Sequence, residues 1–207
     1  FKGPLWKMID DVYNEVIKRL PFTEIRVGTK REKILFFPEE AIREAIINAV
    51  AHRNYRIRTD IRIFIKHDSL VIKNPGSFPP GVTPDNPEHI ARNPKICQFL
   101  YDMGYIERYG YGIIRMKEAV KNHPFATLEF NLGPMYTEVI FKSAYRELNE
   151  AERLIIALLR KGPKTSTEIA QEMNMSKVAV LRKLENLLKL GVIKKSGKGK
   201  KTRYSLS

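Results

Sequence analysis

The chain has 207 residues, of which 43% are hydrophobic and 29% are charged, and its formal net charge is +14. This length allows one or two domains with a sizeable core, and the longest apolar runs fall far short of the ~18 residues that a membrane span needs. A single cysteine, Cys97, excludes an internal disulfide and a multi-cysteine zinc site, so a reducing cytoplasm is the simplest setting. We recognise no signal peptide, and the first residue, Phe1, predicts a fragment of a longer protein.

Positive charge is concentrated in the C-terminal third. Residues 147–207 contain 14 Lys/Arg and 6 Asp/Glu, a net charge of +8, whereas residues 1–146 carry +6. This density favours an anionic partner, nucleic acid first and a membrane surface second. A face that is merely solvated would have the same composition.

The first 142 residues predict helices interspersed with antiparallel strand pairs. Apolar residues recur at helical spacing over 4–20, residues 24–37 resemble short strands, and REAIINAVAHRNYR at 43–56 reads as a helix. Then follow a hairpin, a Pro/Gly-rich loop at 74–87, a helix at 88–103, a glycine-containing loop that opens another helix, and a second hairpin. We expect an N-terminal helix (1–22), an α/β unit of two layers, an α+β sandwich (23–146), and a C-terminal unit (147–207).

One of these helices carries a polar stripe on an otherwise apolar surface. Glu44, Asn48 and His52 are spaced four residues apart, so they lie along one face at 3.6 residues per turn. Buried helices rarely carry a carboxylate, an amide and an imidazole in a row without partners. The stripe therefore marks a candidate site.

Three short pieces follow one another along the chain: EAIIN at 44–48, VIKNPG at 71–76 and ERYGYG at 107–112. Together they resemble the GHKL ATP-binding fold of gyrase-type topoisomerases, MutL and histidine kinases. The resemblance is greatest to the divergent branch in RecG-like transcriptional regulators, and it covers roughly residues 30–142. The N-terminal helix is similar to the segment that follows an AlbA-type (Schlafen-like) domain in those regulators.

The resemblance implies a site for ATP and Mg²⁺. Asn48 takes the position of a neutral oxygen ligand for a Mg²⁺ ion that bridges phosphates, and Glu44 takes that of a residue that orients water or acts as general base. His52 continues the stripe and is assigned only proximity to the cofactor. Arg92 and Asn93 are assigned to a lid over the nucleotide.

Two glycine-containing pieces complete the implied site. Asn74 and Gly76 stand where the family has Asp-x-Gly, whose acid contacts the adenine amino group, so an amide replaces the acid here. Gly110 and Gly112 would allow backbone N–H groups to approach phosphates at a helix N-terminus. At most weak ATPase activity is expected.

The residues themselves leave alternatives open. Glu44 and His52 would also fit a role in ion pairs or exposure to solvent. Asn48 would also fit as the cap of a neighbouring loop, and the glycines as turn residues. The functional alternatives are a slow Mg²⁺-dependent ATPase in DNA metabolism and a dimerisation domain that binds no nucleotide. Helicase activity is not implied, because the chain has no Walker loop.

Residues 147–207 resemble a winged helix-turn-helix. Gly162-Pro163 ends its first helix, Thr165 or Ser166 caps the second, and Ser176 caps the third. VIKKSGKGKKTRYSL reads as two strands around a basic turn. The predicted core consists of Leu154, Ile155, Leu158, Leu159, Ile169, Met173, Leu181, Leu184, Leu187 and Leu188.

A winged helix of this kind places its third helix in the major groove and its wing on phosphates. We expect a regulator of transcription that binds double-stranded DNA as a homodimer, with a nucleotide as possible effector and no membrane partner. A protein-docking winged helix is the alternative, which the basic wing disfavours. The residues expected to contact DNA are Ser176, Lys177, Arg182, Lys183, Lys194, Lys195, Lys198, Lys200, Lys201 and Arg203.

Overall fold

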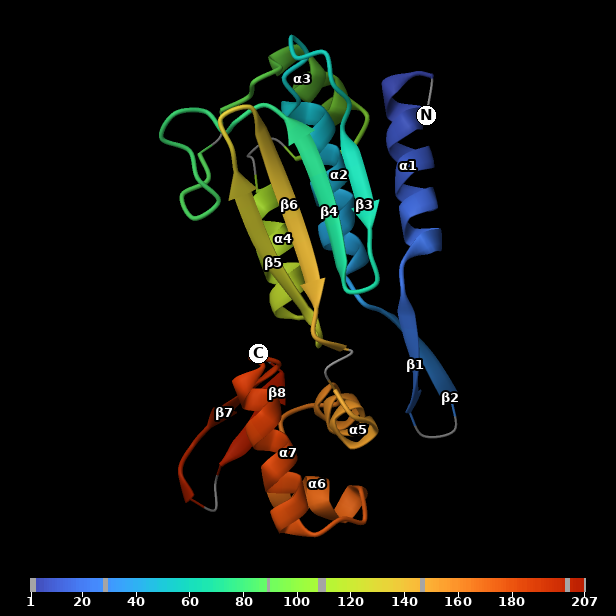
Figure 1. The fold of residues 1–207 in the computed structure, drawn as a ribbon, viewed down its shortest axis with the longest axis vertical. Coiled ribbons are helices and arrows are strands. Elements are labelled where there is room, and N and C mark those ends of the chain that lie inside the picture. The colour runs from blue at the N-terminus through green and yellow to red at the C-terminus, as the bar shows by residue number, and fades with distance from the viewer. Residues whose placement is uncertain are drawn as a thin grey trace.

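The computed structural model describes residues 3–27, 30–88, 90–107, 111–145, 148–199 and 202–206. Figure 1 shows a sheet covered by helices in its upper part and a smaller helical unit with a strand pair in its lower part. The predicted fold class, a two-layer α+β unit followed by a winged helix, is confirmed.

The main sheet is antiparallel throughout. Its order is β3 (Arg62–Ile65), β4 (Ser69–Pro75), β6 (Tyr136–Ser143), β5 (Ala126–Leu132). Residues directly opposite in an antiparallel pair share a face, and β4 and β6 pair Leu70 with Phe141 and Asn74 with Thr137. Because Leu70 and Phe141 are fully buried, Asn74 and Thr137 lie on that same buried face of the sheet.

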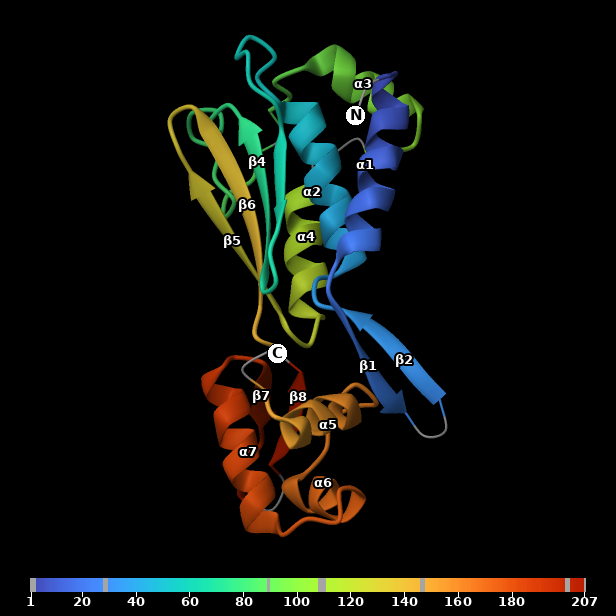
Figure 2. The ribbon, with the colours of Figure 1, turned by 45° about the vertical axis from the view of Figure 1, so that its right-hand side comes forward.

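Two helices, α2 (Glu39–His52) and α4 (Gly112–Lys121), cover this face, and Figure 2 shows α1 (Leu5–Arg19) outside α2. α2 lies between the sheet, α4 and α1, which explains why it is apolar on almost every side. Its buried residues are Ala41, Ile42, Glu44, Ala45, Ile46, Ile47, Ala49 and Ala51.

Two predicted helix boundaries are wrong. The helix expected to reach residue 56 ends at His52, and the following segment joins the sheet through the Asn54 N–H, which donates to Pro75 O at 2.8 Å. The helix expected from residue 88 is α3 (Pro94–Asp102). A residue that precedes proline is disfavoured in the helical region, so the helix begins at Pro94.

The strands predicted within 24–37 form a separate hairpin, β1 (Phe22–Val27) with β2 (Lys30–Leu35), which does not join the main sheet. Near its base lies an aromatic group around Tyr145. The Tyr145 ring centroid is 4.7 Å from that of Phe36 and 4.8 Å from that of Phe125. The chain that follows β6 is therefore anchored to the α/β unit through the buried side chain of Tyr145.

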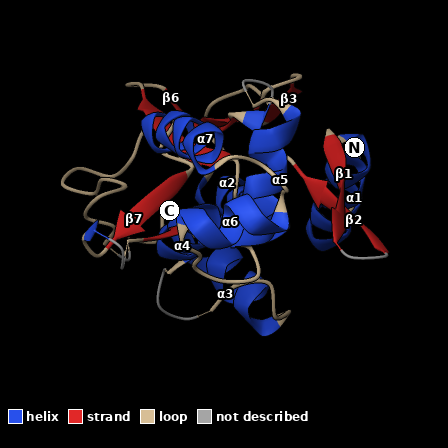
Figure 3. Cartoon of the chain, turned by 90° about the horizontal axis from the view of Figure 1, so that it is seen from below, coloured by secondary structure: helices blue, strands red, loops and turns tan. Residues whose placement is uncertain are grey.

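The C-terminal unit contains α5 (Glu150–Leu159), α6 (Ser166–Glu172), α7 (Lys177–Lys189) and the pair β7 (Ile193–Ser196) and β8 (Arg203–Leu206), seen from below in Figure 3. The predicted caps are confirmed: Thr165 caps α6 and Ser176 caps α7. Asn174 turns the chain between these helices with φ +50°, a conformation that asparagine tolerates better than most residues.

Part of the predicted core of this unit is wrong. Leu154 and Leu181 are 42% and 41% exposed, whereas Ile156 and Val180 are fully buried. Apolar residues occupy several faces of α5, so periodicity alone did not fix the packed side. The packing of α5 on α7 fixes it, and a hydrogen bond from Asn186 Nδ2 to Glu152 Oε1 at 3.0 Å joins these helices.

Among the described residues, no helix combines the length and apolar character that crossing a membrane requires.

Candidate functional site

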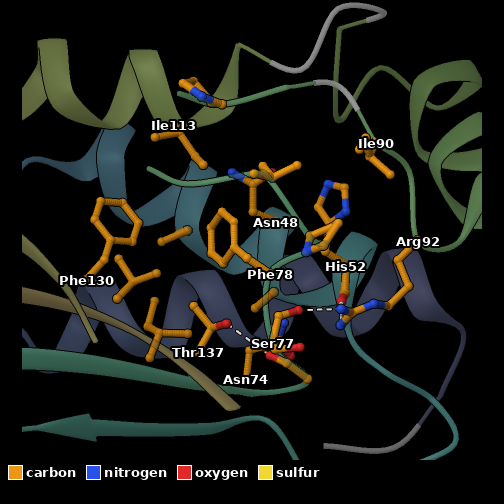
Figure 4. Close-up of a pocket in the computed structure, with 18 of the residues that line it drawn as sticks. Asn48, His52, Asn74, Ser77, Phe78, Ile90, Arg92, Ile113, Phe130 and Thr137 are labelled. Carbon is orange, nitrogen blue, oxygen red and sulfur yellow. Dashed lines mark hydrogen bonds between the residues drawn. The ribbon is translucent and has the colours of Figure 1, made fainter. Parts of the chain in front are cut away.

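A cavity of about 120 Å³ lies between α2, the sheet and the loop that follows β4. Asn48 and His52 reach it from α2, Asn74 and Gly76 from the end of β4, and Thr137 from β6. Figure 4 shows the side chains of Asn48, His52, Asn74 and Thr137 around the ring of Phe78, which comes from the loop. The remaining lining residues are Ala45, Ala49, Ile72, Ser77, Pro79, Val82, Pro87, Glu88, Ile90, Arg92, Ile113, Met116, Phe130 and Val139.

Two amide atoms at this cavity are buried without a hydrogen-bond partner among the described residues, Asn48 Nδ2 and Asn74 Oδ1. A buried polar atom left unpaired costs about 1–3 kcal/mol, so such atoms call for an explanation. The Thr137 hydroxyl, by contrast, donates to Gly76 O at 2.9 Å. The cavity is therefore mostly apolar, with one unpaired donor and one unpaired acceptor.

Arg92 fixes the loop to α2. Its guanidinium donates to His52 O at 3.1 Å and also to Ser77 O. It passes directly over Gly76, where a Cβ atom would collide with it. Gly76 has φ +111°, a backbone conformation that favours glycine whatever side chain lies beside it.

Asn93 has a different position from the one predicted for a lid residue. Its Nδ2 donates to Ala51 O at 2.9 Å and to Arg53 O at 2.8 Å. These carbonyls lie at the C-terminal end of α2, where helices leave acceptors unpaired. Asn93 does not line the cavity, and its observed contacts hold the helix end.

A second, smaller hollow of about 40 Å³ adjoins the first and shares Asn48 and His52 with it. Glu44 and Gly112 line it. A Cβ atom on Gly112 would lie 2.5 Å from Asn48 Nδ2 and 3.0 Å from Glu44 Oε2, so the start of α4 rests directly on the polar stripe. Gly110, the other predicted glycine, lies outside the described residues.

Glu44 is 6% exposed. Burial raises the pKa of its carboxyl, and the guanidinium of Arg43, with Nη1 3.1 Å from Oε1, opposes that shift. A carboxyl with a raised pKa takes up a proton more readily near neutral pH, which suits a general base. Two of the three stripe residues, Asn48 and His52, line both hollows, whereas Glu44 lines only the smaller one.

The side-chain oxygens present would hold Mg²⁺ only together with a bound phosphate. In the described part of the chain, His, Cys, Asp and Glu do not gather in any group of three that would bind a metal. Mg²⁺ commonly takes one or two protein oxygens and completes its shell with phosphates and water. The Asn48 and Glu44 side chains, which lie side by side against Gly112, fit that pattern.

Sequence reasoning missed Thr137, Ser77 and Phe78. Thr137 had a usable signal, because alternation along MYTEVIF places it on the same face as Val139 and Phe141. The two loop residues had none, since the path of a Pro/Gly-rich loop follows from contacts such as those of Arg92 rather than from a periodic pattern.

The outer face of α7 forms the second candidate surface. Lys177 and Arg182 are exposed. Ser176 also lies there, but its hydroxyl accepts from the Ala179 N–H at 3.2 Å as the helix cap. Lys183 is only partly exposed, on the flank of the helix.

The β7–β8 hairpin places Lys194, Lys195 and Lys198 on the surface. Arg203 has partners instead: its Nη1 donates to Pro163 O at 3.0 Å and lies 3.8 Å from Glu168 Oε2. The sequence from Lys189 to Arg203 contains no acidic residue. Lys200 and Lys201 lie outside the described residues.

Comparisons with known proteins match both units. Residues 58–141 match the family described as "Putative ATP-dependent DNA helicase recG C-terminal", and residues 149–195 match the bacterial regulatory proteins of the arsR family. These matches confirm the predicted architecture, a RecG C-terminal-like domain followed by a helix-turn-helix.

The crystal structure of the DIP2311 protein from Corynebacterium diphtheriae is similar over 97% of this chain, with a TM-score of 0.58 and 21% identity. The chain spans 46% of that protein's length, and the likeness concerns the fold. No curated protein matches the sequence significantly.

Proposed function

We propose that this chain is a DNA-binding transcriptional regulator whose winged helix contacts double-stranded DNA and whose α/β unit binds a nucleotide effector. The observation that carries the first part is the set of exposed cations on α7 and the β7–β8 hairpin, Lys177, Arg182, Lys194, Lys195 and Lys198. They lie on the two elements that winged helices apply to DNA. The match to arsR-family regulators over 149–195 supports the same role.

The wing lysines provide the test. Neutralised phosphates release counterions, so log K falls with log salt by about 0.9 per contact. Replacing Lys194, Lys195 and Lys198 with alanine should flatten the slope by up to about 2.7, measured by fluorescence anisotropy with duplex DNA. A matched control replaces three exposed basic residues that precede the winged helix, Lys7, Arg56 and Lys95, and should leave the slope unchanged. Equal slopes in all three proteins would exclude this DNA surface.

The second part rests on the two unpaired amides of the cavity. Asn74 Oδ1 lacks a donor among the described residues, and an exocyclic amino group of a nucleobase would supply one. Asn48 Nδ2 lacks an acceptor there, and a phosphate oxygen would supply one. A nucleotide carries both groups on one molecule.

A nucleotide requires the loop to move. The cavity of about 120 Å³ is smaller than the ~300–1,000 Å³ of ordinary ligand pockets, and the Phe78 ring lies among the lining side chains (Figure 4). Opening would withdraw Phe78 and release the Arg92 contacts to Ser77 and His52. Effector binding is thereby coupled to the position of the loop over residues 76–93.

Mg²⁺, when bound with the phosphates, would neutralise their charge, and Asn48 would hold it. Glu44 would then accept a proton from an attacking water, which defines the alternative function, a slow ATPase. Isothermal titration with ATP, with and without Mg²⁺, tests the role of Asn48 in binding, and release of inorganic phosphate from ATP tests the role of Glu44 in hydrolysis. Asn48→Ala should weaken binding chiefly when Mg²⁺ is present, and Glu44→Gln should preserve binding and remove hydrolysis.

Gln98→Ala, at an exposed amide on α3, is the control and should change neither measurement. Equal loss of binding in the Asn48 and Glu44 variants, or indifference to Mg²⁺, would contradict the assigned roles.

We also propose that the regulator is a homodimer, because helix-turn-helix proteins commonly bind paired half-sites. Sedimentation equilibrium of the chain tests the dimer.

A further inference from the structure

Two branched apolar side chains lie on the outer face of α7, where the fold provides no cover. Val178 is 77% exposed and Leu181 is 41% exposed. They are three residues apart, so they are neighbours on one face of the helix. Arg182 and Glu185 are exposed on the same face, whereas Val180, Leu184 and Leu187 point into the core.

The packing of the unit leaves this face open. Figure 2 shows α5 and α6 to one side of α7, and α7 packs on both of these helices. Val178 and Leu181 lie in the first two turns after the Ser176 cap. These are the turns that a helix-turn-helix inserts into the major groove.

The major groove has one apolar group to offer, the C5-methyl of thymine. We infer that α7 recognises thymine through its methyl group, with Val178 and Leu181 as the contacting side chains. This inference rests on the DNA binding proposed above. It adds that the preferred site contains thymine opposite the first two turns of α7.

Charge argues for DNA rather than a protein as the occupant of this face. Lys177 and Arg182 flank the two apolar side chains, and Lys194, Lys195 and Lys198 lie on the hairpin of the same unit. Residues 147–207 carry a net charge of +8. Glu185 lies on the same face one turn further along, but the residues that flank the apolar pair are cations. An apolar pair between cations matches a groove that has methyl groups between two phosphate backbones.

Replacing thymine with uracil removes the C5-methyl and nothing else. The 207-residue chain is first used to select binding sites from a random duplex library. The best site is then synthesised with uracil at one thymine at a time and titrated by anisotropy. The loss expected for a contacted methyl is about fourfold, from ~0.8 kcal/mol per buried carbon.

At one of the positions where uracil weakens binding, Val178→Ala should bind the thymine and uracil duplexes equally. Leu181→Ala should do the same at a neighbouring position. Glu185→Ala, on the same face one turn further along, is the control and should keep the full sensitivity. Circular dichroism of each variant checks that α7 is folded, and an exposed side chain gives no reason for unfolding.

Three outcomes would overturn the inference, and they are distinguishable. Binding without any uracil effect would leave the regulator proposal intact and exclude methyl recognition. Absence of DNA binding by the unmodified chain would remove the proposed function itself. A change of oligomeric mass in Val178→Ala, seen by sedimentation, with DNA affinity retained would identify the face as a protein interface.

Discussion

The helix caps of the winged helix and the contacts around the cavity differ in range. In the winged helix, Asn149 and Glu152 form a capping box three residues apart, and so do Thr165 and Glu168. At the cavity, Arg92 reaches His52 O over 40 residues and Asn93 reaches Ala51 O over 42. Short-range contacts appear in a sequence as compact patterns, whereas long-range contacts emerge only when the chain has folded.

The first test of this difference concerns His123, for which we expect the largest effect on stability. Its Nε2 pairs with Leu35 O at 3.0 Å, and its Nδ1 accepts from the N–H groups of Phe125 and Ala126 at 3.3 and 3.2 Å. Burial lowers the pKa of the imidazole to about 4, the Leu35 carbonyl opposes that shift, and the charge of Arg160 adds to it. The imidazole is therefore neutral in the folded protein near pH 7.

The unfolded chain binds this proton near pH 6.5 and the folded chain only near pH 4, so stability falls as the pH decreases through that window. The expected loss is about 3 kcal/mol, at 1.36 kcal/mol per pKa unit. Urea unfolding from pH 7 to pH 4 measures this loss as the difference in unfolding free energy between the wild type and His123→Gln. Titratable groups that both proteins share cancel in that difference. His67→Gln, at an exposed imidazole, should reproduce the wild-type profile. A flat difference would show that the long-range contacts of His123 do not control stability.

A second test concerns Gly112, which connects α4 to the stripe on α2. The methyl group of Gly112→Ala would lie 2.5 Å from Asn48 Nδ2, and overpacking of this kind costs about 1–3 kcal/mol. Asn48→Ala in the same chain removes that neighbour, so the double variant should recover part of the loss. The coupling energy from urea unfolding of all four proteins measures the contact. If the two substitutions changed the free energy of unfolding additively, residue 112 and the Asn48 side chain would not be in contact.

Two of the three pieces singled out in the sequence contribute residues to the cavity, and Gly112 of the third lines the smaller hollow. The sequence did not predict how these pieces meet. The four-residue spacing of Glu44, Asn48 and His52 required only a helix, and the positions of the strand end and of the glycines followed from the resemblance. The contacts of Arg92 and the burial of Thr137 depend on how a loop and two strands pack on α2. Periodicity left the face of α5 undecided for the same reason, and Leu154 is exposed where a buried residue was expected.

In the winged helix, Ser176 offers the third and smallest test, because one side chain is assigned two roles. Its hydroxyl caps α7 by accepting from the Ala179 N–H, and the sequence also places it among the residues expected to contact DNA. Loss of a serine cap costs about 1 kcal/mol, so Ser176→Ala should lower the free energy of unfolding by that amount.

Ser176→Asp separates the two roles. Aspartate caps helices as well as serine does, and its charge is favourable at the helix N-terminus, so the stability of this variant should match the wild type. The same charge would repel a nearby phosphate, so its DNA affinity should fall below that of Ser176→Ala. Thr165→Asp, at the cap of α6, is the control and should retain more affinity. If Ser176→Asp bound DNA as tightly as the wild type, the hydroxyl would act only within the helix, as its short-range contact alone predicts.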